Sequence, residues 1–379
     1  MKSRRGSSRT KAVGQLLIIG FDGTEMSPRL ASLLKEIQPA GVILFARNVK
    51  GAEQTWHLLR ECQKWVASPL FTCVDLEGGT VDRFRDLLGS APSAADVFDT
   101  GYRKLYRKHG RIIGENCRAL GFNVDFAPVL DLAFAASQKV MTSRTVSAKP
   151  GHTITYAREF LAGLRAANVL GCGKHFPGLG EGALDSHQAL PVIVKPLKKL
   201  WSEDLLPYRK LHQALPFVMV AHAAYPEVTG DQTPASLSER WIREILCKRI
   251  GYRNLIVSDD LEMGGVLAAA PIGEAAVQSI LAGSDLCLVC HHEERVRQVH
   301  EELVKTAERD AAFAEQVENS AERVRAFKKK WARILQPART APSNRKVQRL
   351  KRVLWEFGEQ VRLESLNRKQ GARDRVRRA

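Results

Sequence analysis

The sequence predicts an α/β protein built as a (β/α)8 TIM-type barrel, because eight apolar runs alternate with helical segments. The eight runs are rich in strand-forming residues and cover 16–19, 41–45, 70–74, 122–129, 169–172, 217–220, 254–257 and 285–289. The segments between them space apolar and charged residues as a helix does, over 29–37, 52–66, 102–120, 156–167, 237–250 and 273–282. Alternating strands and helices indicate a parallel sheet covered by helices. Eight such units in about 300 residues fit a closed barrel better than an open, doubly wound sheet.

Ionisable residues follow five successive predicted strands at their carboxyl ends. In chain order they are Asp75 with Glu77, Asp131, Lys174 with His175, His222, and Asp259 with Asp260. In a barrel the carboxyl ends of the strands share one rim, where the loops build the active site. Packing alone does not explain charged groups on five successive strands. The sequence therefore predicts an active site at this rim.

The loop after the fifth predicted strand carries the densest set of polar groups. It begins with Lys174 and His175 and ends in Asp185-Ser186-His187, which sets a carboxylate two residues from an imidazole. Taken alone, an ordinary polar turn explains this tripeptide equally well, because Asp and Ser favour turns. The rim residues of the other strands favour the chemical interpretation.

Seven separated segments carry a family resemblance, in family order and within residues 14–310. They are 19–24 (IGFDGT), 41–48 (GVILFARN), 74–79 (VDLEGG), 126–131 (FAPVLD), 174–187, 234–238 (PASLS) and 258–263 (SDDLEM). The chain resembles glycoside hydrolase family 3, and within it the single-domain bacterial β-N-acetylglucosaminidases that recycle cell-wall muropeptides. The resemblance implies a β-N-acetylhexosaminidase that releases β-linked N-acetylglucosamine from muropeptide fragments with retention of configuration.

The resemblance also implies the catalytic residues. Family members form a covalent glycosyl ester with an aspartate at the end of the seventh strand, which matches Asp259. We favour Asp259 over Asp260, since the first continues the strand at the rim and the second can cap the next helix. In relatives with the Asp-Ser-His loop the histidine is general acid and base and the aspartate orients it, which indicates His187 and Asp185. Glu181 is the rival acid, and the sequence offers it no orienting partner.

Sugar binding in the relatives uses a further set of side chains, which match Asp75, Arg83, Arg144, Lys174 and His175. A carboxylate accepts hydrogen bonds from sugar hydroxyls, while Arg and Lys donate to hydroxyls and to the N-acetyl carbonyl. A solvated surface position is the alternative for Arg83 and for Arg144. We expect His222 to orient a neighbour rather than to act as a catalyst.

The chain departs from the family pattern at three positions. Relatives carry Gln, Arg and His where this sequence has Leu76, Thr80 and Leu179. Three polar groups are therefore lost. Leu179 puts loop dynamics or a distal subsite in question rather than the chemistry, and the nucleophile and the Asp-His pair are intact.

The motif Cys287-x-x-Cys290-His291 matches the pattern of covalent haem attachment. It overlaps the eighth apolar run, so we expect both cysteines to pack as small apolar residues. The sequence therefore predicts no metal and no cofactor.

Composition indicates a globular protein of the cytoplasm. The 379 residues are 44% hydrophobic and 26% charged, enough to bury a large core. No apolar run reaches the length of a membrane span, and the first residues lack the apolar centre of a signal peptide. The cysteine count of seven is odd, which favours reduced thiols.

The net charge of +17 is concentrated at the two ends of the chain, with 13 of the charges in residues 1–12 and 340–379. We therefore expect a basic N-terminal tail (1–13), a catalytic barrel (14–336) and a basic helical extension (337–379). In the extension, apolar residues recur at helical spacing at Val347, Leu350, Val353, Leu354, Phe357, Val361 and Leu363. This amphipathic helix packs on the barrel or on a partner. A solvated basic face explains its charges without nucleic acid.

Other functions remain open at this stage. Within the enzyme class, the alternatives are a broader β-glycosidase and an N-acetylglucosaminide phosphorylase. Outside it, the alternative is a non-catalytic binding protein with a basic tail.

Overall fold

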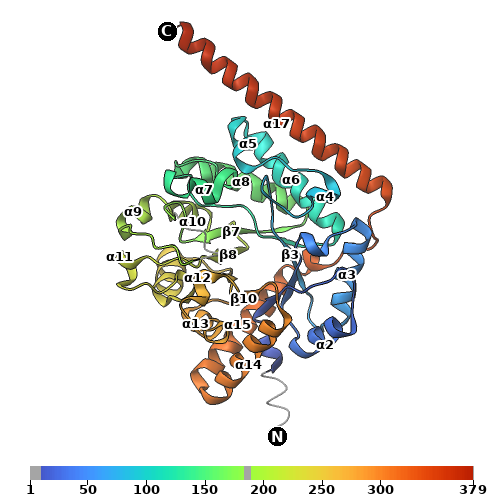
Figure 1. Cartoon of the computed structure of the whole chain (residues 1–379), viewed down its shortest axis with the longest axis vertical. Coiled ribbons are helices and arrows are strands. Elements are labelled where there is room, and N and C mark those ends of the chain that lie inside the picture. The colour runs from blue at the N-terminus through green and yellow to red at the C-terminus, as the bar shows by residue number, and fades with distance from the viewer. Residues whose placement is uncertain (1–9, 183–188, 379) are drawn as a thin grey trace.

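Eight parallel strands close into one barrel in the computed structural model, which describes residues 10–182 and 189–378 (Figure 1). The barrel order is β1, β10, β9, β8, β7, β6, β3 and β2. The strands are β1 (Leu17–Ile19), β2 (Gly41–Ile43), β3 (Phe71–Val74), β6 (Val124–Asp125), β7 (Leu170–Phe176), β8 (Phe217–Val220), β9 (Leu255–Asp260) and β10 (Leu286–Val289). Each lies within or overlaps one predicted apolar run, so the predicted barrel is confirmed.

The pairing register within the barrel shifts at two places near the carboxyl rim. One shift separates Leu286 from Leu288 in the β9–β10 pair, where Leu288 lies opposite Asp260. The other separates Gly173 from Phe176 in the β7–β8 pair and so brackets Lys174 and His175. Such irregularities re-aim side chains at the ends of strands. Both occur beside residues that the sequence placed in the active site.

Helices cover the outside of the barrel. The longer ones are α2 (Pro28–Ile37), α3 (Ala52–Lys64), α6 (Arg103–Leu120), α8 (Pro150–Ala166), α13 (Ile272–Ala282), α14 (Glu293–Arg309) and α15 (Ala311–Lys330). The helix expected over 237–250 is a π-helix, η5 (Arg240–Ile250), after a 3-10 turn, η4 (Ala235–Leu237). Ser27 begins α2, where its hydroxyl accepts a hydrogen bond from the Leu30 N–H.

Short elements build the loops around the rim, and two of them form the antiparallel pair β4 and β5. They are β4 (Leu76–Gly78), β5 (Val81–Asp82), η1 (Ala46–Asn48), η2 (Ala135–Ser137), η3 (Thr142–Arg144), α4 (Arg85–Leu88), α5 (Ala94–Asp99), α7 (Gln138–Met141), α9 (Leu197–Ser202), α10 (Leu206–Leu211), α11 (Pro226–Thr229), α12 (Gly264–Leu267) and α16 (Ala332–Leu335).

Helices α6 and α8 pack closely because glycines stand at their contact. A Cβ atom on Gly110 would lie 2.0 Å from the Phe160 carbonyl oxygen, and one on Gly163 would lie 2.3 Å from that of Arg107. Neither backbone leaves room for a side chain, so α8 is held directly against α6.

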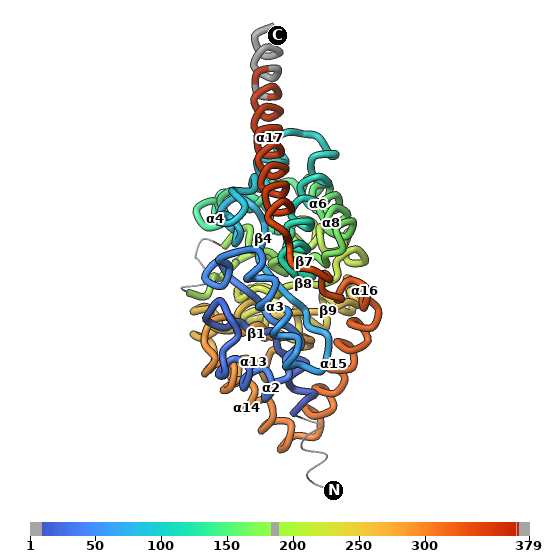
Figure 2. Tube along the Cα trace, turned by 90° about the vertical axis from the view of Figure 1, so that its right-hand side faces the viewer, coloured from blue at the N-terminus to red at the C-terminus, as the bar shows by residue number. Residues whose placement is uncertain are grey.

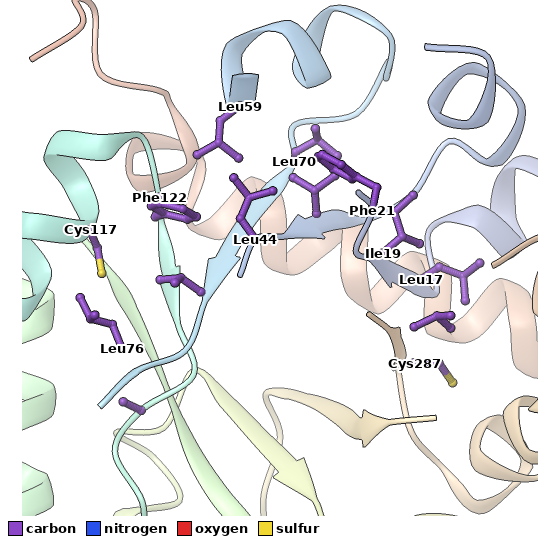
Figure 3. Close-up of a cluster of buried hydrophobic side chains, with 14 of the residues drawn as sticks. Leu17, Ile19, Phe21, Leu44, Leu59, Leu70, Leu76, Cys117, Phe122 and Cys287 are labelled. Atoms are coloured by element: carbon purple, nitrogen blue, oxygen red, sulfur yellow. The ribbon is translucent and has the colours of Figure 1, made fainter. Parts of the chain in front are cut away.

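The hydrophobic core fills the space between strands and helices (Figure 3). Leu17 and Ile19 of β1 and Leu44 after β2 belong to a buried cluster that also contains Phe122. Leu76, one of the departures from the family pattern, is buried in the same cluster. An apolar residue therefore suits this buried position, where a side chain would not be exposed to solvent.

The basic extension forms one long helix, α17 (Asn344–Arg378), as predicted. Its buried residues Leu350, Leu354, Phe357 and Val361 join the main core cluster and pack beside α4, α5 and α6. The helix runs along the side of the barrel, and its C-terminal end projects beyond it (Figure 2). No helix in the described part of the chain is long and apolar enough to cross a membrane.

All seven cysteines are free thiols, and Cys287 and Cys290 are buried at the end of β10. Burial raises the pKa of the Cys287 thiol to about 12. Both residues pack as small apolar side chains in the barrel wall, as the sequence predicted.

Candidate active site

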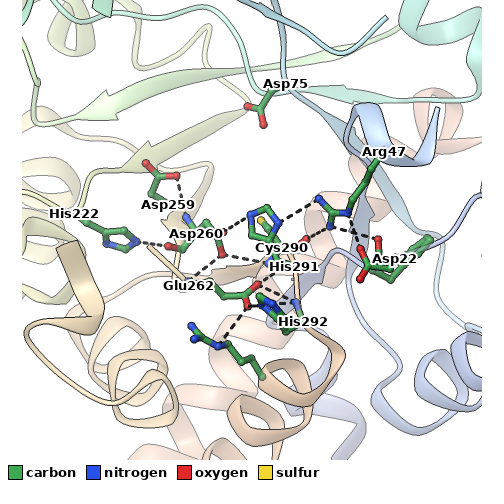
Figure 4. Close-up of polar contacts among 12 residues, drawn as sticks. Asp22, Arg47, Asp75, His222, Asp259, Asp260, Glu262, Cys290, His291 and His292 are labelled. Carbon is green, nitrogen blue, oxygen red and sulfur yellow. Dashed lines mark hydrogen bonds and ion pairs between the residues drawn. The ribbon is translucent and has the colours of Figure 1, made fainter. Parts of the chain in front are cut away.

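A cavity opens at the carboxyl rim of the barrel and gathers six of the eight predicted site residues. Asp75 follows β3, Lys174 and His175 end β7, and Asp259 ends β9, while Arg83 and Arg144 enter from the β5–α4 loop and from η3. Asp75 and Asp259 enter this space from different sides (Figure 4). The other two predicted residues, Asp185 and His187, lie outside the described residues.

The two adjacent aspartates of β9 have different surroundings. Asp260 is buried, and its Oδ1 accepts hydrogen bonds from the backbone N–H groups of Glu262 at 3.1 Å and Cys290 at 3.2 Å. The Asp259 carboxylate lines the cavity, and the described residues give it one hydrogen bond, from the Asp260 N–H at 2.9 Å. Asp260 therefore holds the backbone of the loop. Among the described residues, the Asp259 carboxylate remains available to contact a substrate.

Asp259 is also kept ionised. Burial alone would raise the pKa of its carboxyl group, but the neighbouring imidazole of His175, the Asp260 N–H and the charge of Lys174 together lower it below its usual value. A carboxylate that stays ionised at neutral pH is suited to nucleophilic attack on an electrophilic carbon.

His222 supports the end of β9 through two polar contacts. Its Nδ1 lies 2.7 Å from the Ser236 hydroxyl and its Nε2 lies 3.0 Å from the carbonyl oxygen of Asp260. Burial lowers the pKa of His222, so the ring is neutral, with Nε2 donating to the carbonyl and Nδ1 accepting from Ser236. The contact with Asp260 gives His222 an orienting role.

Lys174 and Arg144 are held by two acidic residues. The Lys174 ammonium lies 2.7 Å from Asp75 Oδ1 and 2.6 Å from Glu77 Oε1. Arg144 donates two hydrogen bonds to the Glu77 carboxylate, from Nε at 2.8 Å and from Nη2 at 2.9 Å. This bidentate contact fixes the plane of the guanidinium group.

Glu77 is a residue of the site to which sequence analysis assigned no role. It is buried, and burial would raise the pKa of its carboxyl group, but the charges of Arg144 and Lys174 lower that pKa well below its usual value. Its position after the third strand was visible in the sequence. Its partner is 67 residues away along the chain, and only the fold shows the contact.

His175 is oriented by Asp131, a second residue that the sequence placed at the rim without a role. The His175 Nδ1 lies 2.7 Å from Asp131 Oδ2, and Asp131 also accepts hydrogen bonds from the N–H groups of His175 and Leu179. The Nε2 edge of the ring is 3.5 Å from Nη2 of Arg144. Asp131 therefore fixes both the imidazole and the first turn of the loop that follows.

Within the described part of the chain, Arg83 has N–H donors at the cavity without a close acceptor. Its Nη2 is 4.0 Å from Asp75 Oδ2, its guanidinium lies 5.4 Å from the centre of the Phe45 ring, and its Nε is buried with no hydrogen-bond partner in the described part of the chain. An arginine with unused N–H groups beside a cavity is suited to bind the oxygen atoms of a ligand.

Glu181 has the partner that sequence reasoning did not find. The buried ammonium of Lys195 lies 3.1 Å from Glu181 Oε1, 2.7 Å from Glu203 and 2.6 Å from Asp204. The statement that Glu181 lacks an orienting partner was therefore wrong, because the partner comes from a segment 14 residues further on. This ion pair anchors the described beginning of the loop after β7.

His291 also lines the cavity and was not among the predicted site residues. Its ring stacks on Phe45 with centroids 5.2 Å apart, its Nε2 lies 3.4 Å from Asp260 Oδ2, and its Nδ1 lies 3.2 Å from Arg47 Nη1 (Figure 4). The hydrogen bond to Asp260 raises the pKa of His291. His291 was visible in the sequence as the last residue of the Cys287 to His291 motif, but that motif matched a haem-attachment pattern and gave no indication of a place in the active site.

Carboxylates, cations and imidazoles gathered in a cavity at the rim of an eight-stranded barrel define an enzyme active site suited to a polar substrate. The model of the glycosyl hydrolase family 3 N-terminal domain matches residues 9–327. The chain belongs to this family.

Curated relatives agree with this membership. A β-hexosaminidase of Idiomarina loihiensis is 34% identical over 300 residues, covering 78% of this chain and 90% of the relative. One of Alkalilimnicola ehrlichii is 37% identical over 290 residues, covering 75% and 82%. The family match and the names of these relatives confirm the prediction that the chain is a glycoside hydrolase of the β-N-acetylhexosaminidase type.

Solved structures show the same architecture. The family 3 β-N-acetylglucosaminidase from Paenibacillus sp. str. FPU-7 is similar with a TM-score of 0.84 and 31% identity, over 91% of this chain and 68% of that one. A family 3 glycosyl hydrolase from Mycobacterium smegmatis is similar with a TM-score of 0.74 and 30% identity, over 84% and 96%.

Proposed function

We propose that this family 3 enzyme is a retaining β-N-acetylhexosaminidase that releases β-linked N-acetylglucosamine from muropeptide-like cell-wall fragments. The observation that carries the proposal is the environment of Asp259, an ionised carboxylate that faces the cavity and accepts one hydrogen bond from the described residues, while its neighbour Asp260 accepts two from the loop backbone. The β-N-acetylglucosaminidase name of the similar Paenibacillus structure supports the choice of sugar.

The reaction has two steps in this proposal. Asp259 attacks the anomeric carbon, the bond to the leaving oxygen breaks, and His187 gives that oxygen a proton. In the second step His187 takes a proton from water, the water oxygen attacks the anomeric carbon, and the ester to Asp259 breaks. Two displacements at one carbon retain its configuration. Asp185 orients the imidazole and favours its protonated form.

The sugar is held by the side chains that surround Asp259. Asp75 accepts hydrogen bonds from ring hydroxyls, and Lys174, already bound to Asp75, donates to the same region. Arg83 and Arg144 donate to hydroxyls and to the N-acetyl carbonyl. His175 supports both, because its Nε2 edge faces Arg144 and its imidazole is one of the neighbours that lower the pKa of Asp259.

Glu181 is a poor alternative for the acid. Its carboxylate lies 3.1 Å from the buried ammonium of Lys195, so it is already engaged in an ion pair that anchors the start of the loop. We therefore retain His187 as acid and base.

A leaving-group test separates the two candidates. His187→Ala should slow hydrolysis of a natural glycoside about 10²- to 10⁴-fold, the usual contribution of general acid and base catalysis. With a nitrophenyl leaving group, which needs little protonation, the first step should be spared and a burst of nitrophenol should appear. Equal slowing of both substrates by His187→Ala, with the leaving-group dependence in Glu181→Gln instead, would assign the role to Glu181.

Two simpler assays test the competing functions. Release of nitrophenol from the N-acetylglucosaminide, but little from the glucoside, separates the proposed enzyme from a broader β-glycosidase and from a binding protein. Product analysis with and without phosphate separates hydrolysis from phosphorolysis, since a phosphorylase forms the sugar phosphate. Seven free thiols support a reducing compartment, so we place the reaction in the cytoplasm.

A further inference from the structure

The solvent-facing side of α17 carries large apolar side chains that nothing in the described chain covers. Trp355, Leu363 and Leu366 are 67%, 51% and 52% exposed. At about 100° per residue, all three project from one side of the helix. The residues that bury α17 against the barrel, such as Leu354 and Phe357, project from the other side. Exposed apolar groups that gather on one helix face mark a contact surface.

A basic cluster continues this face toward the start of the helix. Arg345, Arg349 and Arg352 are exposed and line a shallow surface hollow. Among the described residues, Arg352 has an ion pair, with Glu356 at 3.6 Å, whereas Arg345 and Arg349 have none. We call Arg345, Arg349, Arg352, Trp355, Leu363 and Leu366 the outer face of α17. It extends about 30 Å along the helix, from its basic end to its apolar end.

The partner must satisfy both parts of this face. A surface of acidic phospholipid offers phosphates to the arginines and a shallow apolar layer to Trp355 and the leucines. A second copy of α17 packed parallel would set two basic clusters against each other, and one packed antiparallel would set Arg345 against Leu366, which offers no negative charge. A nucleic acid offers phosphates but no apolar layer for Leu363 and Leu366. The charge and the apolar groups together therefore favour the phospholipid surface.

The placement of α17 allows such contact. The helix lies along the side of the barrel, and its C-terminal end projects clear of it, so a flat surface can reach the outer face without displacing the barrel (Figures 1 and 2). Leu354 and Phe357 hold the helix against the barrel from the opposite side, where the Arg368 guanidinium also donates to the Asp99 carbonyl. Docking would therefore leave the barrel and its cavity unchanged.

We propose that the outer face of α17 docks the enzyme onto membranes rich in acidic phospholipid, as a peripheral contact without a membrane span. This inference goes beyond the proposed function and does not depend on it, because it concerns a surface remote from the cavity residues.

The test is sedimentation of the full chain with vesicles of phosphatidylcholine alone or with about one third phosphatidylglycerol. We expect binding to the acidic vesicles only, and release by salt. Arg345→Gln with Arg349→Gln should weaken binding about 30-fold, at about 1 kcal/mol for each base. Trp355→Ser should weaken it about tenfold or more, since it removes an apolar group from the contact.

Matched controls separate this face from general charge and hydrophobicity. Lys198→Gln with Lys199→Gln removes the same charge from α9, and Leu281→Ser removes an exposed apolar residue from α13. Neither should change vesicle binding. Hydrolysis of the nitrophenyl glycoside should be unchanged in every variant. Equal binding to neutral vesicles, equal effects of the controls, or binding to an RNA or DNA duplex or to a second copy of the chain in place of vesicles would each overturn the proposal.

Discussion

Replacing Glu77 with glutamine should show how far the site depends on one buried carboxylate. Glu77 contacts Lys174 at 2.6 Å and Arg144 at 2.8 and 2.9 Å, so Glu77→Gln leaves Lys174 with Asp75 alone and removes the carboxylate that pairs with Arg144. Breaking a buried ion pair from one side costs about 3 to 5 kcal/mol. Because the glutamine oxygen still accepts one hydrogen bond, we expect a loss near the lower value, about 3 kcal/mol. The affinity for substrate should fall with it, since Arg144 loses its fixed orientation.

The pH dependence gives this prediction a sign. The pKa of Glu77 is lowered by folding, so the stabilisation by its charge is present above the ordinary pKa of a glutamic acid and is lost as pH falls below it. Urea denaturation of wild type and Glu77→Gln at pH 7 and at pH 4 measures the difference. We expect a full difference at pH 7 and a smaller one at pH 4. A difference that is negligible at pH 7, or that grows on acidification, would refute the reasoning.

Three further predictions concern buried charges. Lys328 donates hydrogen bonds to Gln15 and Ser68, and burial lowers its pKa to about 7. The free-energy cost of burying its charge is therefore largest at and below pH 7 and declines toward pH 10. Lys328→Met should raise the melting temperature more at pH 6 than at pH 9. Lys195→Met should lower the melting temperature more at pH 8 than at pH 5. Burial already raises the pKa of its partner Asp204 to about 6, so the carboxylate left unpaired by this change is ionised mainly at the higher pH. Asp260→Asn should retain most turnover and Asp260→Ala should not, because the asparagine oxygen still accepts the two backbone hydrogen bonds of the loop. Equal rates of nitrophenol release by the two variants would contradict this prediction.

The sequence predicted the barrel well because its strands are buried on both faces. Runs such as 217–220 and 285–289 are continuously apolar, and this signal does not depend on distant contacts. The rim residues followed from the barrel, since Asp75 and Asp259 stand directly at the carboxyl ends of their strands in the structure.

The partners of the rim residues could not be predicted in the same way. Glu77 meets Arg144 and His175 meets Asp131 across 67 and 44 residues, and the pairing depends on how each loop turns above the barrel. The contact between Lys195 and Glu181 likewise depends on the return of the chain after the β7 loop. Leu76 was interpreted as a lost polar group, whereas the structure buries it in the core.

The most direct test of the central claim is the identity of the residue that carries the covalent intermediate. The enzyme would be incubated with a mechanism-based fluorinated N-acetylglucosamine derivative that slows the second step, digested, and analysed by mass spectrometry. We predict a glycosyl ester on Asp259 in the peptide from β9, and no label in Asp259→Ala. A label on Asp260, Asp75 or any other residue, or continued turnover by Asp259→Ala, would contradict the proposed mechanism.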